Sequence, residues 1–157
     1  MPINFNSIYW IPILLLLDEI LHLWILLMFI IICIVWSIKN FVNSSLEIQI
    51  GVEDYNWACF ASQQAAKKAL KALAMHVLGE YVRGHDLIKL YRRLKQFINQ
   101  KIDEDLLAKL SAYYTLARYP NAGIERPHEE FTEGQAKEAL QIAEVIVNEV
   151  SKAIRDP

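Results

Sequence analysis

The chain has 157 residues and a net charge of −2, with 22% charged residues and only five glycines, five prolines and two cysteines. This composition excludes a disordered or fibrous protein, and the length predicts one domain with room for a short appendage. Because Cys33 and Cys59 form no CxxC pair and His22 and His76 have no ligand-spaced partner, we expect no disulfide framework and no metal site. The sequence has no GxGxxG or P-loop motif, and we expect no cofactor.

The first 36 residues are far more apolar than the rest of the chain. Residues 20–36, ILHLWILLMFIIICIVW, contain His22 as their only strongly polar side chain, and a helix of this length reaches about 25 Å, the lower limit for crossing a bilayer. No Lys or Arg precedes this segment and Lys39 follows it, which predicts that the following domain is cytoplasmic. The alternatives are a helix buried in an oligomer and translation from a wrongly chosen start. We divide the chain into a hydrophobic segment, residues 1–35, and a helical domain, residues 36–157.

From residue 36 onward, the spacing of apolar residues predicts helices and no strands. The first helix continues from the apolar segment and stops near Gly51. The second begins with Asp54 as its N-cap and ends at Gly79. Its predicted inward stripe is Trp57, Ala61, Ala65, Ala69, Ala72 and Leu73. The third helix is predicted over residues 84–98, with an inward face of Leu87, Leu90, Tyr91 and Leu94.

The last two helices have clear starting residues. Asp103 is the predicted cap of the fourth helix, which runs to Arg118, and Thr132 and Gln135 form a capping box for the last. The sum is an all-α, antiparallel up-and-down bundle of four to five helices behind an N-terminal hydrophobic helix. The connection 120–131 is long for such a bundle, which makes it a candidate functional loop.

Basic residues gather in one part of the chain. Between Lys67 and Lys101, nine basic residues are accompanied only by Glu80 and Asp86, whereas eleven acidic and six basic residues follow from Asp103 onward. The basic part is a candidate phosphate-binding surface. The alternative is a pair of solvated faces that attract each other.

Four motifs resemble those of HEPN domains and occur in the same order. They are YNWACFASQQAAKKALKAL (residues 55–73), GHDLIKL (84–90), ARYPNA (117–122) and FTEGQAKEALQIAEVI (131–146). The resemblance covers about residues 36–154 and leaves out the apolar front end. It implies a small helical bundle that dimerises, often as the partner of a minimal nucleotidyltransferase in a toxin–antitoxin pair. For many members it also implies metal-independent ribonuclease activity, carried by an Arg and a His separated by four to six residues.

In that chemistry the His transfers a proton at the ribose 2′-hydroxyl or leaving oxygen, and the Arg stabilises charge developing on the phosphate. The candidate catalytic pair in this chain is Arg118 and His128. Nine residues, YPNAGIERP, separate them, which departs from the spacing of the family motif. The activity is therefore not carried over from the resemblance.

Several further residues are candidates for a site because they offer charge to phosphate or a ring to a base. The candidate nucleotide- or RNA-binding residues are Arg118, Tyr119, Arg126, Lys67, Lys68 and Lys71. Helix-capping or other structural roles are predicted for His85, Asp86, Pro120 and Thr132. Each binding candidate also has a structural alternative: capping for the arginine at a helix end, packing for the tyrosine and solvation for the lysines.

The combined prediction is a dimeric binding module. Its partner is a minimal nucleotidyltransferase, its ligand is nucleotide or RNA, and its membrane anchor is the segment 20–36. Two alternatives remain open at this point. One is a metal-independent endoribonuclease using Arg118 and His128, and the other is a non-catalytic assembly scaffold.

Overall fold

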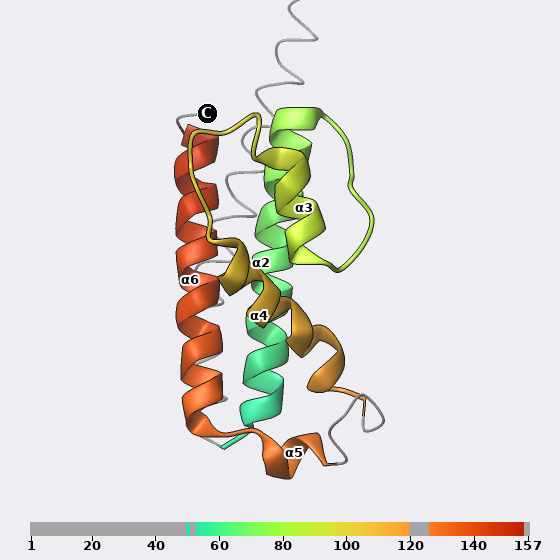
Figure 1. Ribbon diagram of the computed structural model, residues 1–157, viewed down its shortest axis with the longest axis vertical. Coiled ribbons are helices and arrows are strands. Elements are labelled where there is room, and N and C mark those ends of the chain that lie inside the picture. Colours follow the sequence, from blue (N-terminus) through green and yellow to red (C-terminus); the bar gives the residue numbers. More distant parts are fainter. Residues whose placement is uncertain (1–49, 51–52, 120–125, 156–157) are drawn as a thin grey trace, which may run out of the picture.

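A computed structural model describes residue 50, residues 53–119 and residues 126–155 (Figure 1). Its helices are α2 (Tyr55–Leu78), α3 (Leu87–Leu94), α4 (Glu104–Leu116), α5 (Pro127–Glu130) and α6 (Glu133–Arg155). These described ranges contain no strand, so the predicted all-α helical bundle is confirmed.

The apolar segment 20–36 and the helix expected to stop near Gly51 lie outside the described residues. Within the described part of the chain, no helix is both long enough and apolar enough to cross a membrane. Membrane attachment and the cytoplasmic location of the domain therefore stay predictions.

The three longest helices of the described part alternate in direction. α2 packs most extensively against α6, and both run the same way, while α4 runs against them (Figure 1). This alternation agrees with an up-and-down order. α3 is the exception, because the loop 79–86 carries the chain back along α2. The start of α3 therefore lies beside Gln63, near the middle of α2, and Arg93 at its end pairs with Glu80.

Local capping explains most helix ends. Gly79 adopts φ 67° and its N–H donates to the Met75 carbonyl, which ends α2 in the left-handed conformation that glycine favours. The carboxylate of Asp103 accepts from the N–H of Asp105 at 2.9 Å. At α6, Thr132 Oγ1 accepts from the Gln135 N–H at 3.3 Å, and Gln135 Oε1 accepts from the Thr132 N–H at 2.9 Å. The predicted capping box is thus confirmed.

The core is built largely from small side chains on the two helices that pack most closely. Buried alanines allow helix axes to approach, since the distance between packed helices depends on the side chains at the contact. On α2 these residues are Ala58, Ala65, Ala66, Ala69, Ala72 and Ala74, and on α6 they are Ala136, Ala139, Ala143 and Ala153. Larger residues from α3 and α4, including Leu87, Leu94, Leu107 and Leu110, complete the core.

Three local predictions need correction, and one connection contains an additional short helix. Trp57 is 47% exposed and does not belong to the inward stripe of α2. Asp54 precedes α2, but its side chain makes no capping hydrogen bond. The third helix stops at Leu94 instead of continuing to residue 98, because the chain turns there and the Ile102 N–H donates to the buried Tyr91 hydroxyl at 3.0 Å. The long connection before α6 contains the short helix α5.

Candidate functional site

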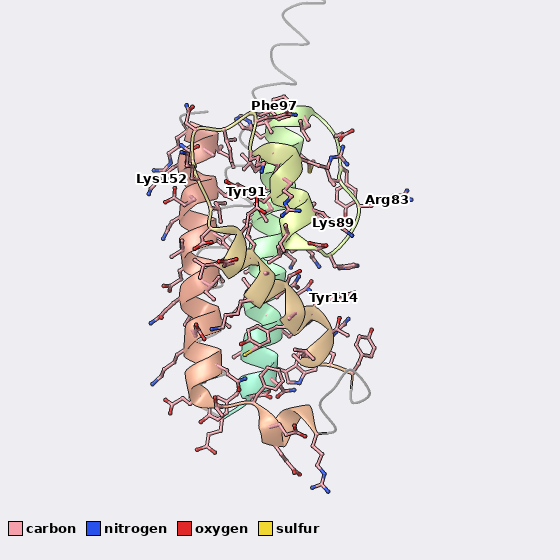
Figure 2. The ribbon with its side chains drawn as sticks, in the orientation of Figure 1. Arg83, Lys89, Tyr91, Phe97, Tyr114 and Lys152 are labelled. Atoms are coloured by element: carbon pink, nitrogen blue, oxygen red, sulfur yellow. The ribbon has the colours of Figure 1, made fainter. Side chains whose placement is uncertain are left out.

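Three segments that are far apart in the sequence meet on the side of the bundle away from α6. They are one face of α2, the loop 79–86 and the end of α4, which carries Tyr114 (Figure 2). On α2 the residues follow helical spacing, with Phe60, Gln63, Lys67 and Lys71 on one face. The opposite, alanine-rich face of α2 is buried in the core.

Tyr114 is the centre of the arrangement. The imidazole of His85 stacks on its ring with a centroid distance of 4.2 Å and an interplanar angle of 21°. Arg118 Cζ lies 4.7 Å and Lys67 Nζ lies 5.9 Å from the centroid of the same ring. One aromatic side chain therefore brings an imidazole, a guanidinium and an ammonium group together.

Arg118 is held from several sides. Its Cζ also lies 4.5 Å from the Phe60 ring centroid and 5.1 Å from that of Tyr119. The Nε donates to the Tyr114 carbonyl at 3.4 Å, and Nη2 donates to the Tyr119 hydroxyl at 3.2 Å. The predicted capping role of this arginine is thus visible, because it contacts a carbonyl in the last turn of α4. Asn56 ties the same helix end to α2, since its Nδ2 donates to the Ala117 carbonyl at 3.3 Å.

A chain of side-chain amides fixes the loop and the lysine relative to each other. The fully buried Gln63 donates through Nε2 to the His85 carbonyl at 3.0 Å. Its Oε1 accepts from Gln64 Nε2 at 2.7 Å, and Gln64 Oε1 accepts from Lys67 Nζ. The Lys67 ammonium is therefore oriented by neutral groups.

The site has an excess of positive charge. Lys67 is only 9% exposed, yet no described carboxylate forms an ion pair with it, with Lys71 or with Arg118. Burial lowers the pKa of Lys67, and the charges of Lys71, Lys68 and Arg118 lower it further. The pKa of His85 is lowered by desolvation and by the charges of Lys67, Lys71 and Arg118, which favours the neutral imidazole at pH 7.

Most basic residues elsewhere in the described structure have an acidic partner. Glu104 pairs with Arg92 and Lys95, Glu80 with Arg93, Glu138 with Lys109 and Glu149 with Lys152. The excess charge at Lys67 and Arg118 is therefore a local property of this face and not a general shortage of acidic residues.

The structure brings together four of the six predicted binding residues: Lys67, Lys71, Arg118 and Tyr119. Lys68 is exposed on α2 and influences Lys67 only through its charge. Arg126 forms its contacts within the α5 segment, where Nη1 donates to Glu129 Oε2 at 2.9 Å and its N–H donates to Glu130.

The predicted structural residues have different outcomes. Asp86 caps α3, since its Oδ1 accepts from the N–H groups of Ile88 and Lys89 at 3.0 and 3.1 Å. His85 does not share that role, because its ring faces Tyr114. Pro120 and the side chain of His128 lie outside the described part, so the Arg118/His128 pair stays a prediction.

Sequence reasoning missed the part played by Phe60, Gln63 and His85. A buried glutamine on a helix has no local sequence signal, and His85 is 29 positions before Tyr114, on a loop whose return path no periodicity predicts. No group of three or more His, Cys, Asp or Glu residues in the described ranges could hold a metal ion.

Comparison with known proteins agrees with this fold. The HEPN domain model matches residues 40–153, beyond the apolar front end. Two solved structures share 31% identity with the chain: TT1696 from Thermus thermophilus, and ST0689, described as an archaeal HEPN homologue. The first covers 80% of this chain and 97% of its own with a TM-score of 0.66, and the second covers 76% and 97% with a TM-score of 0.56. A search of curated proteins finds no match. The chain belongs to the HEPN domain family.

Proposed function

We propose that this HEPN domain is a binding module for the phosphate groups of a nucleotide or RNA, which contact Lys67, Lys71 and Arg118. The observation that supports it most strongly is the environment of Lys67, a residue only 9% exposed. Its ammonium donates to Gln64 but has no acidic partner among the described residues, and its neighbouring charges are the cations Lys68, Lys71 and Arg118. Burying a cation without an anion is unfavourable, and a phosphate at this position supplies the missing charge. The His85–Tyr114 stack and the rings around Arg118 give the neighbouring surface for a base.

The test is a Lys67→Met variant, which keeps most of the length of the side chain and removes its charge. We expect isothermal titration with ATP and with an RNA hexanucleotide to show binding to the wild type. We also expect about tenfold or greater weakening in the variant, because a hydrogen bond to a charged group contributes about 1.5–3 kcal/mol.

The matched control is Lys152→Met. This lysine lies on the outer side of α6, away from Tyr114 (Figure 2), and is paired with Glu149. Its loss is expected to leave both affinities unchanged. Equal weakening in the two variants, or no weakening in Lys67→Met, would contradict the proposal. If neither ATP nor RNA binds the wild type, the assembly-scaffold alternative gains support.

The second candidate function is metal-independent RNA cleavage. One observation favours it: His85 and Arg118 contact the same Tyr114 ring, and the lowered pKa of His85 favours a neutral imidazole that can accept a proton. RNA incubated with the protein in EDTA tests this function. Cleavage lost in both Arg118→Ala and His85→Asn would assign the chemistry to this pair. Loss in His128→Ala, with His85→Asn active, would assign it to the pair predicted from the sequence.

Membership in the HEPN family also supports two proposals about assembly, a homodimer and a complex with a minimal nucleotidyltransferase. Light scattering on the purified protein tests the first. Co-purification with a nucleotidyltransferase encoded beside it tests the second.

A further inference from the structure

A second pairing of a cation with an aromatic ring lies at the other end of the same face. Lys71 Nζ donates to the Tyr81 hydroxyl at 3.1 Å and lies 4.6 Å from the centroid of its ring. Tyr81 is 65% exposed, so packing against the bundle does not account for its position. Its acidic neighbour Glu80 is engaged by Arg93, which leaves Lys71 without a carboxylate partner among the described residues.

The loop 79–86 places this second pair in line with the first. Because the loop returns along α2, Tyr81 lies beside Lys71, and His85 lies level with Gln63 and Tyr114. Arg118 and the half-exposed Tyr119 follow at the far end, next to Phe60. The face therefore has an exposed ring at each end and cations between them.

The length of this face exceeds what one nucleotide needs. At about 1.5 Å per residue, α2 rises about 16 Å between Phe60 and Lys71. That distance matches roughly five stacked nucleotides at about 3.4 Å each. A mononucleotide whose phosphates contact Lys67, Lys71 and Arg118 would leave the exposed Tyr81 ring unused.

We infer that Lys71 and Tyr81 form a second subsite, at which an unpaired base of a single-stranded polynucleotide stacks on Tyr81. In this arrangement the phosphates follow Lys71, Lys67 and Arg118, and Tyr119 offers a ring to a base at the other end. Stacking requires a base released from a duplex, so the face selects single strands over double strands. This inference rests on the proposed function and adds to it the class of ligand.

Anisotropy with fluorescein-labelled oligoadenylates of two, four and six nucleotides tests the subsite in the full chain, with RNA and DNA versions of each. We expect affinity to rise with length, and Tyr81→Ala to weaken the hexamer about tenfold while ATP affinity is unchanged. Tyr81→Phe keeps the ring and is expected to bind as the wild type does. Three phosphate contacts predict a slope of about −2 in a plot of log affinity against log salt. The RNA and DNA versions show which polynucleotide is preferred.

Phe97→Ala is the matched control, because this ring is also half exposed but, unlike the Tyr81 ring on Lys71, pairs with no cation of the described residues. This variant is expected to bind the hexamer and ATP as the wild type does. The inference is overturned if Tyr81→Ala binds the hexamer normally, if Phe97→Ala weakens it equally, or if a blunt RNA duplex binds as tightly as the single strand. In those cases ATP binding that depends on Lys67 would leave the proposed function intact. Absence of any binding to the wild type would overturn both.

Discussion

Replacing Arg118 with alanine is expected to weaken binding of the RNA hexanucleotide by about ten- to a hundredfold, the range for losing one charged hydrogen-bonding group. The guanidinium is already oriented, because Nε donates to the Tyr114 carbonyl and Nη2 to the Tyr119 hydroxyl. Nη1 makes no hydrogen bond within the described ranges, so its donors can reach phosphate oxygens. Binding then requires little reordering of this side chain, which favours affinity.

Two further arginine variants separate charge, geometry and stability. Arg118→Lys keeps the charge and loses the planar fork, so we expect an intermediate affinity. Arg126→Ala removes an arginine whose charge is already matched by Glu129, and no change is expected. Thermal melting of each variant checks that the fold persists. Full affinity in Arg118→Ala, or an equal loss in Arg126→Ala, would show that the guanidinium beside Tyr114 is not the binding group.

Lys67→Met is expected to stabilise the free protein by about 0.5–2 kcal/mol, the usual gain from a stabilising substitution, although it weakens ligand binding. The reason is that the ammonium is buried among like charges. Burial, and after it the neighbouring positive charges, lower the pKa of Lys67 below 10.5 in the folded state. The unfolded chain therefore holds this proton more tightly than the folded one. At neutral pH the charged lysine opposes folding, and a methionine of similar length removes that opposition.

The sign of this effect sets its pH dependence. The stability gained in Lys67→Met is present in full below the folded pKa of the lysine and declines as pH rises towards 10.5, where both states lose the charge. Urea unfolding in phosphate-free buffer at two pH values measures it. Lys68→Met is the control, since that side chain is exposed on the same helix and should change stability by less than about 0.5 kcal/mol. A destabilised Lys67→Met would mean that its contacts outweigh its charge.

The helix boundaries that the sequence predicts well depend on neighbouring residues. Gly79, Asp103 and the Thr132–Gln135 box act within one turn, so their effects can be read from a short stretch of sequence. The end of α3 depends instead on a hydrogen bond between Ile102 and Tyr91, which exists only after the chain has turned. Periodicity extends the helix past that point because nothing local stops it.

The residues of the candidate site also fall into two groups, those that a short stretch of sequence indicates and those that depend on distant segments. Lys67, Lys71 and Arg118 are predictable as candidate binding residues, since a basic residue on a helix can be recognised from its position alone. The stacking of His85 on Tyr114 depends on the path of the loop 79–86, and the burial of Gln63 depends on the segment packed over it. These relations join residues on different segments, and a single sequence contains no direct signal for them.

The shared direction of α2 and α6 has a consequence for how the chain folds during synthesis. Their first turns are neighbours, since Glu133 and Lys137 act electrostatically on Tyr55, although most of the domain separates them in the sequence. The alanine-rich face of α2 therefore has no α6 to cover it until the last helix, Glu133–Arg155, has left the ribosome. Contacts between distant residues slow folding, so this bundle is expected to fold more slowly than one built from successive hairpins. A nascent chain that stops before α6 exposes that face to chaperones or to other chains.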